Sequence, residues 1–274
     1  MQSETAIGAV PAAADTWADI ATLTVPAGVK RLMRIRGGIA PAPGALFQIH
    51  TTPVIRLLGA GLLEQNPHEF VLQGVNMAIA AANTGGINAE PPVFEYDVDI
   101  PVATGGQITI QINCLDEIPA AMTSRVELDY DERDATAKNQ MSQYVDAPAP
   151  VAANAWTNVG ILNVPQLTAA NSPTGIREIV CGITPDVAGN ALLRNSARFR
   201  LSGSGLKEPG LHQFIASQMG VMWTTPGAQG SFFPIVRTKV DLLVNSGGQI
   251  LVEAISDVDL QPVTSTAVLG VLYY

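Results

Sequence analysis

Carboxylate side chains are concentrated toward the end of the first half of the sequence, where their spacing could create a cation site. Asp97 and Asp99 are two residues apart, as are Asp129 and Asp131, and alternate residues of a β-strand lie on one face. Ca²⁺ prefers such oxygen ligands, although the segment lacks the glycine and the closing glutamate of an EF-hand loop. We therefore name these four aspartates as candidate Ca²⁺ ligands. The alternatives are a solvated acidic face or one that meets a basic neighbour, and the sequence supports no other cofactor.

Basic side chains form one short cluster. In an extended strand, alternation would place Lys30, Arg34 and Arg36 on one face. Such a face could form salt bridges with a neighbouring subunit, contact anionic lipid or nucleic acid, or remain an exposed strand face. We name these three residues as candidates for an assembly interface.

Residues suited to covalent or acid–base catalysis are scarce. The sequence has no phosphate-binding glycine loop, HExxH, GxSxG or CxxC motif. His68 and His212 occupy equivalent places in an internal repeat, where they would form either a duplicated metal or proton site or a hydrogen-bonding residue at a helix start. Cys114 and Cys181 lie in strand-like runs and are expected to be buried thiols. We name no catalytic residue and expect that the chain is not an enzyme.

The composition excludes several classes of protein. Of 274 residues, 14% are charged and 47% hydrophobic, with 25 Gly and 19 Pro. This hydropathy excludes intrinsic disorder, and the net charge of −9 argues against a nucleic-acid binder. Few charges and many prolines also argue against a helical bundle. The acidic excess is confined to residues 1–134, which carry 7 basic and 16 acidic groups against 8 and 8 in residues 135–274.

The sequence contains an internal duplication. Blocks of similar residues recur in the same order at a nearly constant shift of 139 to 144 residues, which chance does not produce. The matching blocks are 17–26 with 156–165, 56–64 with 200–208, and 98–108 with 240–250. We therefore predict a first domain at 1–134, a linker at 135–150 rich in small and polar residues, and a second domain at 151–274.

Within each copy the hydrophobic period is two, as in β-strands. Gln107–Cys114 alternates strictly, and 266–274 is almost wholly apolar, as in a strand buried on both faces. Six to eight short strands per copy indicate a sandwich or barrel. The segments 67–82 and 211–222 interrupt this pattern with apolar residues at helical spacing. The predicted fold is thus all-β, with two tandem β-sandwiches that each contain one short inserted helix.

This arrangement resembles the double jelly-roll major capsid proteins of tailless icosahedral viruses, the adenovirus and tectivirus lineage, with a length close to the minimal corticovirus-like members. The resemblance rests on architecture. It is carried by strand-to-helix segments at 46–49 with 67–82 and at 197–201 with 211–222, and by closing strands at 249–255 and 267–274. It implies jelly-roll topology for both sandwiches.

The resemblance also implies a structural virion protein, made in the host cytoplasm, whose homotrimers have a pseudo-hexameric outline and tile an icosahedral shell. Its partners would be further copies of itself, other virion proteins and an inner membrane, without sequence-specific nucleic acid. Two alternatives remain. One is a tandem β-sandwich module that binds carbohydrate, or an adhesin, using Trp17, Trp156 or Trp223. The other is a subunit of a non-viral filament or shell.

Overall fold

The computed structural model describes most of the chain, and the regular elements of the described residues are all β-strands. The described residues include no helix that is long and apolar enough to span a membrane. The described ranges are 2–41, 47–64, 67–72, 75–79, 94–115, 122–134, 141–148, 154–167, 172–185, 196–208, 210–218, 235–256 and 265–274.

The first half of the chain forms two four-stranded antiparallel sheets. The order β1-β10-β3-β8 joins β1 (Gln2–Ala9), β10 (Met122–Asp131), β3 (Arg31–Pro41) and β8 (Phe94–Pro101). The order β2-β9-β5-β6 joins β2 (Ala18–Thr24), β9 (Gln107–Cys114), β5 (Pro53–Leu58) and β6 (His68–Val71). A separate two-stranded ladder pairs β4 (Phe47–Thr51) with β7 (Val75–Ile79).

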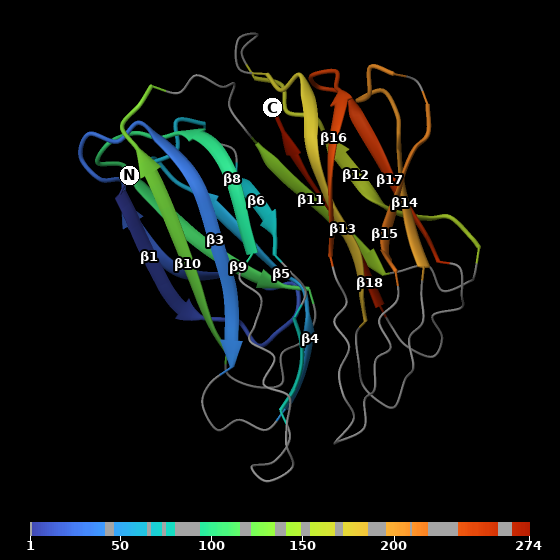
Figure 1. Ribbon diagram of the computed structural model, residues 1–274, viewed down its shortest axis with the longest axis horizontal. Helices are drawn as coiled ribbons and strands as arrows, with labels where there is room; N and C mark the ends of the chain where they lie inside the picture. Colours follow the sequence, from blue (N-terminus) through green and yellow to red (C-terminus); the bar gives the residue numbers. More distant parts are fainter. Residues whose placement is uncertain are drawn as a thin grey trace.

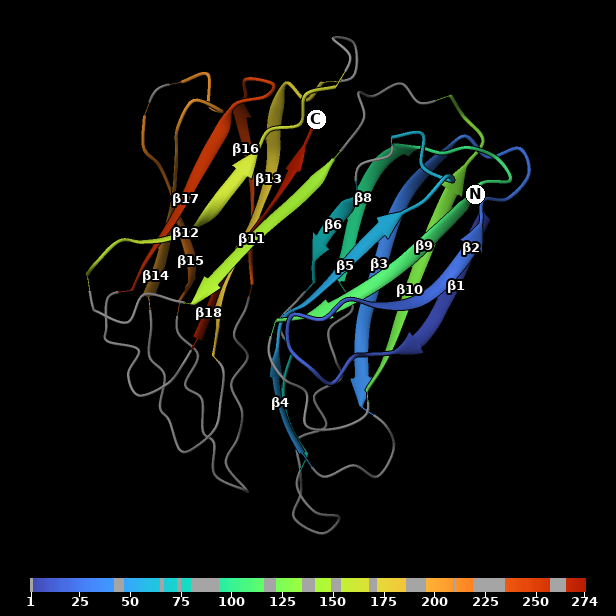
Figure 2. The ribbon, with the colours of Figure 1, turned by 180° about the vertical axis from the view of Figure 1, so that it is seen from behind.

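The second half repeats this pattern. The order β11-β18-β13-β16 joins β11 (Ser142–Pro148), β18 (Ser265–Tyr273), β13 (Gly175–Pro185) and β16 (Val236–Leu243). The order β12-β17-β14-β15 joins β12 (Thr157–Asn163), β17 (Gln249–Ser256), β14 (Ser196–Ser202) and β15 (His212–Gln218). Figures 1 and 2 show the two halves side by side, with their strands running in the same general direction.

Both halves have jelly-roll topology. If the eight sheet strands of each half are numbered in chain order, leaving out β4 and β7, the orders are 1-8-3-6 and 2-7-4-5 in both halves. This double-sheet arrangement of eight antiparallel strands defines the jelly roll. The expected all-β fold of two tandem jelly rolls is therefore confirmed.

The two expected helices are wrong within the described residues. The segment 67–82 contributes β6 and β7, and 211–222 contributes β15. Their backbones pair with neighbouring strands, β6 with β5 and β15 with β14, so tertiary pairing decides the conformation. The apolar residues of these short edge strands matched a helical period by coincidence.

The segment predicted as a linker is also partly a strand. Residues 142–148 form β11, which pairs along its whole length with β18. The chain therefore enters the second sandwich before residue 151, where the sequence had placed its start. Residues 135–140, 149 and 150 lie outside the described residues.

The alternation seen in the sequence builds the cores. Ile108, Ile110 and Ile112 of β9 point inward and are fully buried, as their equivalents in β17 are. Cys114 and Cys181 are buried free thiols, as predicted, and burial raises the pKa of Cys181 to about 12. β18 is buried on both faces, also as predicted, because it packs on its own sandwich with one face and on the first half with the other.

Candidate functional site: a charged outer face and the junction between the two halves

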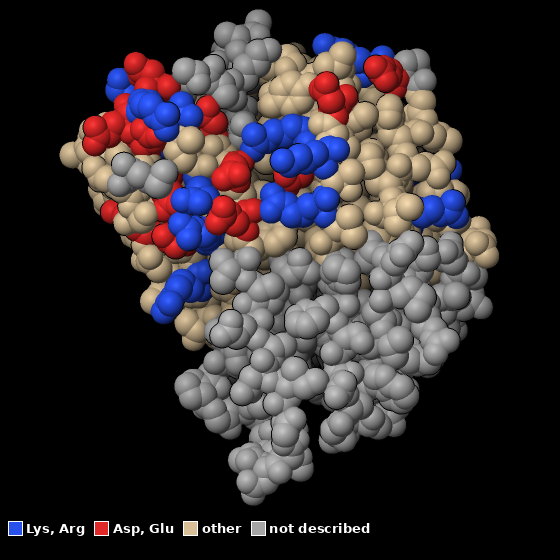
Figure 3. Space-filling view, viewed as in Figure 1, with Lys and Arg blue, Asp and Glu red and all other residues tan. Residues whose placement is uncertain are grey.

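The outer face of the sheet β1-β10-β3-β8 carries a ladder of opposite charges. Arg34 Nε and Arg36 Nη2 donate hydrogen bonds to the same carboxylate oxygen of Asp129, at 2.8 and 3.1 Å. Glu95 on β8 and Glu127 on β10 flank Arg36, each 3.5 Å away. Figure 3 shows acidic and basic side chains gathered over the first half and basic ones in the middle of the molecule, whereas much of the remaining described surface of the second half is uncharged on this side.

Asp129 is the centre of this ladder and is only 1% exposed. Burial alone would raise its pKa, but hydrogen bonds from Ser3, Arg34 and Arg36 outweigh burial and hold the pKa below the ordinary value. A carboxylate with two guanidinium partners is satisfied within the chain. It therefore acts as a fixed structural anion of this face.

The structure separates the candidate assembly residues into two places. Arg34 and Arg36 share the outer face as predicted, whereas Lys30 lies before β3 and pairs with Asp134 at 2.5 Å. A register irregularity between Leu32 and Arg34 interrupts the alternation that had placed all three together.

The four candidate Ca²⁺ ligands are not brought together. Asp99 lies 3.1 Å from Arg31, Asp131 pairs with Arg133, and the carboxylate of Asp129 belongs to the ladder. Within the described ranges, no three His, Cys, Asp or Glu side chains are grouped closely enough to hold a metal ion. The alternation in sequence did not predict the arginine partners of Asp99 and Asp129, because they come from another strand, β3, whereas Arg133 follows Asp131 directly in the chain.

The equivalent face of the second half is apolar and buried at three positions that carry charge in the first half. Arg36 lies opposite Glu127 in the first half, and Val180 lies opposite Gly270 in the second. Arg36 is therefore equivalent to Val180, and Glu127 to Gly270. In the same way Val268 replaces Arg125, and Leu272 replaces Asp129. Val180, Val268 and Leu272 belong to the core cluster of the first half. One duplicated face is thus a charged surface, and its copy is the junction between the halves.

At three other positions on these faces, a charged residue of the first half is replaced by a residue of opposite charge in the second half. Arg34, Glu95 and Asp97 of the first half correspond to Glu178, Arg237 and Lys239 of the second. This reversal places opposite charges across the junction, where Arg237 and Arg177 donate to the backbone oxygens of Glu95 and Asp97. A comparison of charges between the matched blocks could have found these residues, but their meeting depends on how the halves pack.

Arg237 connects the two halves through several contacts. Its Nη2 lies 2.6 Å from Glu178, which is only 8% exposed. Its guanidinium carbon lies 4.7 Å from the ring centre of Phe94 and 4.6 Å from that of Tyr96. A guanidinium over aromatic faces is a favourable cation–π arrangement. The hydroxyl of Tyr96 in turn donates to the backbone oxygen of Val71, at 2.6 Å.

The other side of the junction is acidic. The backbone N–H of Tyr144 on β11 donates to Glu69 on β6, and the Tyr144 ring lies edge-on to Trp17, 6.4 Å away. Burial, together with a smaller effect from the charge of Asp15, raises the pKa of Asp146 to about 6. Burial also raises the pKa of Glu69, against the charge of Arg56.

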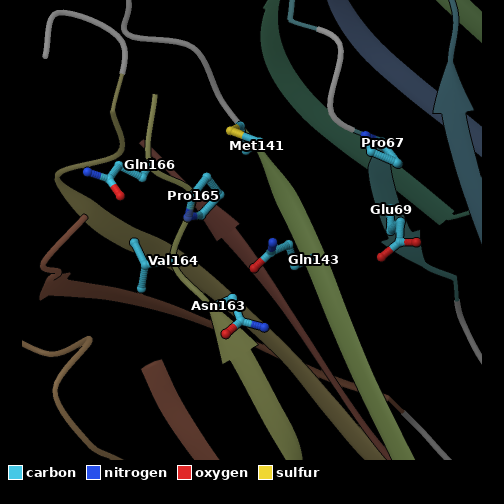
Figure 4. Close-up of a pocket in the computed structure, with 8 residues that line it drawn as sticks. All are labelled: Pro67, Glu69, Met141, Gln143, Asn163, Val164, Pro165 and Gln166. Carbon is cyan, nitrogen blue, oxygen red and sulfur yellow. The ribbon is translucent and has the colours of Figure 1, made fainter. Parts of the chain in front are cut away.

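A cavity of about 360 Å³ opens beside this acidic part of the junction, between β6 and the β11–β12 region. Figure 4 shows Glu69 on one side of it and the amides of Gln143, Asn163 and Gln166 on the other. These groups could hold a small ligand that presents hydroxyl or amide groups.

The duplicated histidines lie at the start of equivalent strands, and the duplicated tryptophans pack against arginines. His68 is fully buried and begins β6, while its counterpart His212 begins β15 and is half-buried. Trp17 and Trp156 are each covered by an arginine, whose guanidinium carbon lies 3.9 and 4.3 Å from the ring centre. Trp223 lies outside the described residues, as does the side chain of His50.

Several solved structures resemble the chain over its whole length. PNGase F, a glycosylasparaginase from Flavobacterium meningosepticum, is 8% identical, with a TM-score of 0.46 and coverage of 99% of this chain and 96% of that one. The major capsid protein of Sulfolobus turreted icosahedral virus is 11% identical, with a TM-score of 0.42 and coverage of 100% and 97%. The major capsid protein P2 of bacteriophage PM2 is 11% identical, with a TM-score of 0.37 and coverage of 100% and 98%. No protein-family description and no curated protein sequence matches the chain.

Proposed function

We propose that the chain is a structural virion protein, a major capsid protein, whose three copies form a trimer with six similar jelly rolls around its axis. The observation that carries this proposal is the presence of two jelly rolls of identical strand order in one chain, joined through a buried apolar junction. A trimer of such chains has nearly six-fold lateral contacts, which suits a closed lattice.

The surfaces support a role in lateral assembly. The junction uses one duplicated face, so its charged copy, with Arg34 and Arg36, remains available to a neighbour. Arg34 and Arg36 stay candidates for that contact, and Lys30, which lies before β3 and away from this face, stays a candidate for a separate contact with a neighbour. The proposal includes a virion location, synthesis in the host cytoplasm, and other virion proteins and an inner membrane as further neighbours. It includes no catalytic role and no sequence-specific nucleic acid.

Light scattering after size exclusion tests this proposal. A stable species of three chain masses, with six-lobed particles in electron micrographs, is the expected result. A monomer at every protein concentration, salt concentration and pH examined would overturn the proposal.

The junction cavity favours a second candidate function, the binding of carbohydrate. Glu69 and three amides line it, and such groups hydrogen-bond to sugar hydroxyls. A glycan array should then give a signal that Glu69→Gln abolishes and that Glu208→Gln, an exposed acid outside the cavity, leaves unchanged. An array without any signal would remove this candidate.

A further inference from the structure

The two jelly rolls expose the same sheet edge to different surroundings. β6 and β15 are equivalent edge strands, and β6 is covered by β11 and β18 of the second half. Val71 of β6 is accordingly 1% exposed, and a Cβ placed on Gly270 of β18 would lie 3.0 Å from its Cγ2. Ile215, the equivalent of Val71 in β15, is 59% exposed.

The uncovered edge has the character of a contact surface. Val54 lies opposite Val71 in the first half, and Arg198 lies opposite Ile215 in the second. Leu211, just before β15, is also 59% exposed. Proteins rarely leave an apolar edge strand unprotected, because it invites pairing or packing with another chain.

The junction within the chain indicates which surface would cover this edge. Gly270 covers Val71, and the equivalent of Gly270 in the first half is Glu127, on the charged outer face. The same face presents Ile7, which lies opposite Arg125 and is 54% exposed. A repeat of the junction between chains would therefore place Arg198 of one copy near Glu127 of the next.

We propose that the edge formed by Arg198, Gln213 and Ile215 docks on the outer face of β1-β10-β3-β8 of a second copy, and so repeats between chains the packing that joins the halves within one chain. The occupant is a second copy because the covering surface is already part of the same sequence, offers opposite charge at Glu127 and leaves an isoleucine exposed. This contact is heterologous, so it forms closed rings or open filaments. The proposal rests on the proposed assembly function and names its interface.

Single substitutions give the first test, read by light scattering with circular dichroism and thermal unfolding as folding checks. Ile215→Glu should reduce assembly at least tenfold while the unfolding temperature stays unchanged. Leu63→Glu is the matched control, because Leu63 is 62% exposed but lies outside both surfaces, and it should assemble normally. An Ile215→Glu chain that assembles like the unmodified chain would overturn the proposed interface.

Charge exchange gives a second test that does not depend on one substitution. Arg198→Glu and Glu127→Arg should each weaken assembly, and the double variant should recover much of it. Equal assembly of all three variants would contradict the pairing. So would a double variant whose loss of assembly equals the sum of the losses in the two single variants.

A disulfide gives a geometric test. Within the chain, the backbone N–H of Tyr144 donates a hydrogen bond to the carboxylate of Glu69. The equivalent of Glu69 in the second half is Gln213, and the equivalent of Tyr144 in the first half is Thr5. Gln213→Cys combined with Thr5→Cys should give covalent oligomers on oxidation, and each single variant should not. Cys114 and Cys181 are buried and will not compete. Absence of cross-linking in chains that assemble would exclude this interface but leave the assembly function standing, whereas unmodified chains that never assemble would exclude both.

Discussion

The guanidinium of Arg237 lies 4.6 Å from the ring centre of Tyr96, so a cation of the second jelly roll stacks on an aromatic ring of the first. The same guanidinium neutralises Glu178 on its own half. Removing it would therefore weaken the junction and also leave a buried carboxylate without its cation.

Arg237→Ala should lower the free energy of unfolding by about 2–3 kcal/mol, because both the cation–π contact and the ion pair are lost. Arg237→Lys should lose less, since it keeps the charge but not the planar group. Urea unfolding measures both. Lys239→Ala, on the same strand and exposed, is the control, and an equally large loss for that variant would contradict the explanation.

Gly270→Ala should also weaken the junction, by about 1–2 kcal/mol, because the new methyl group would lie 3.0 Å from the Cγ2 atom of Val71. The loss should shrink when Val71→Ala is made in the same chain, since room is then created. A double-mutant cycle by thermal unfolding measures this coupling. Gly210→Ala, where nothing lies within 4 Å of the added Cβ, should be nearly neutral, and additive effects of the Gly270 and Val71 substitutions would show that the two residues do not meet.

Asp129→Asn should destabilise the chain by about 2 kcal/mol at pH 7, because two arginines lose their shared anion. The folded pKa of Asp129 is lowered, so its contribution is present above the unfolded pKa of about 4 and disappears as the pH falls through the folded value. Urea titrations at pH 7 and pH 2.5 should therefore give a smaller difference between the variant and the unmodified chain at the lower pH. A difference that is constant with pH would contradict this role.

Asp146→Asn should raise the free energy of unfolding at neutral pH, whereas Asp129→Asn lowers it. The folded pKa of Asp146 is raised to about 6, so the stability that its protonated form contributes is complete below pH 4 and is lost as the pH rises through 6. At pH 7.5 the asparagine variant should be more stable by about 1–2 kcal/mol, and near pH 4 the two chains should be similar. Glu132→Gln, an exposed acid, should change neither value, and a destabilised Asp146→Asn chain at pH 7.5 would refute the prediction.

The sequence predicted those parts of the fold that depend on local alternation and on the duplication. The strict alternation of Gln107–Cys114 became β9, and the apolar run at 266–274 became the doubly buried β18. The segments 67–82 and 211–222 have apolar residues at helical spacing, and a short edge strand has too few residues to establish a period of two, so the sequence wrongly predicts helices there. Their strand character comes from pairing with β5 and β14, which no local window contains.

The candidate site was less accessible from sequence, because its contacts join distant strands. The sequence predicts the shared face of Arg34 and Arg36, but its spacing of carboxylates suggests a cation site for Asp129, which in the structure is their hydrogen-bond partner. The register irregularity between Leu32 and Arg34 separates Lys30 from that face. The role of Gly270 could not be seen at all, since it depends on the packing of one jelly roll against the other.

The position of β18 has a consequence for biosynthesis. It is hydrogen-bonded to β11 on one side and β13 on the other, yet the ribosome makes it after every other described strand. Until it emerges, the sheet that contains it stays divided, and Val71 of the first half stays uncovered. Completion of the second jelly roll and burial of that edge are therefore one event. A nascent chain stalled before β18 would expose two surfaces to chaperones at once, the unpaired edges of β11 and β13 and the apolar edge at Val71.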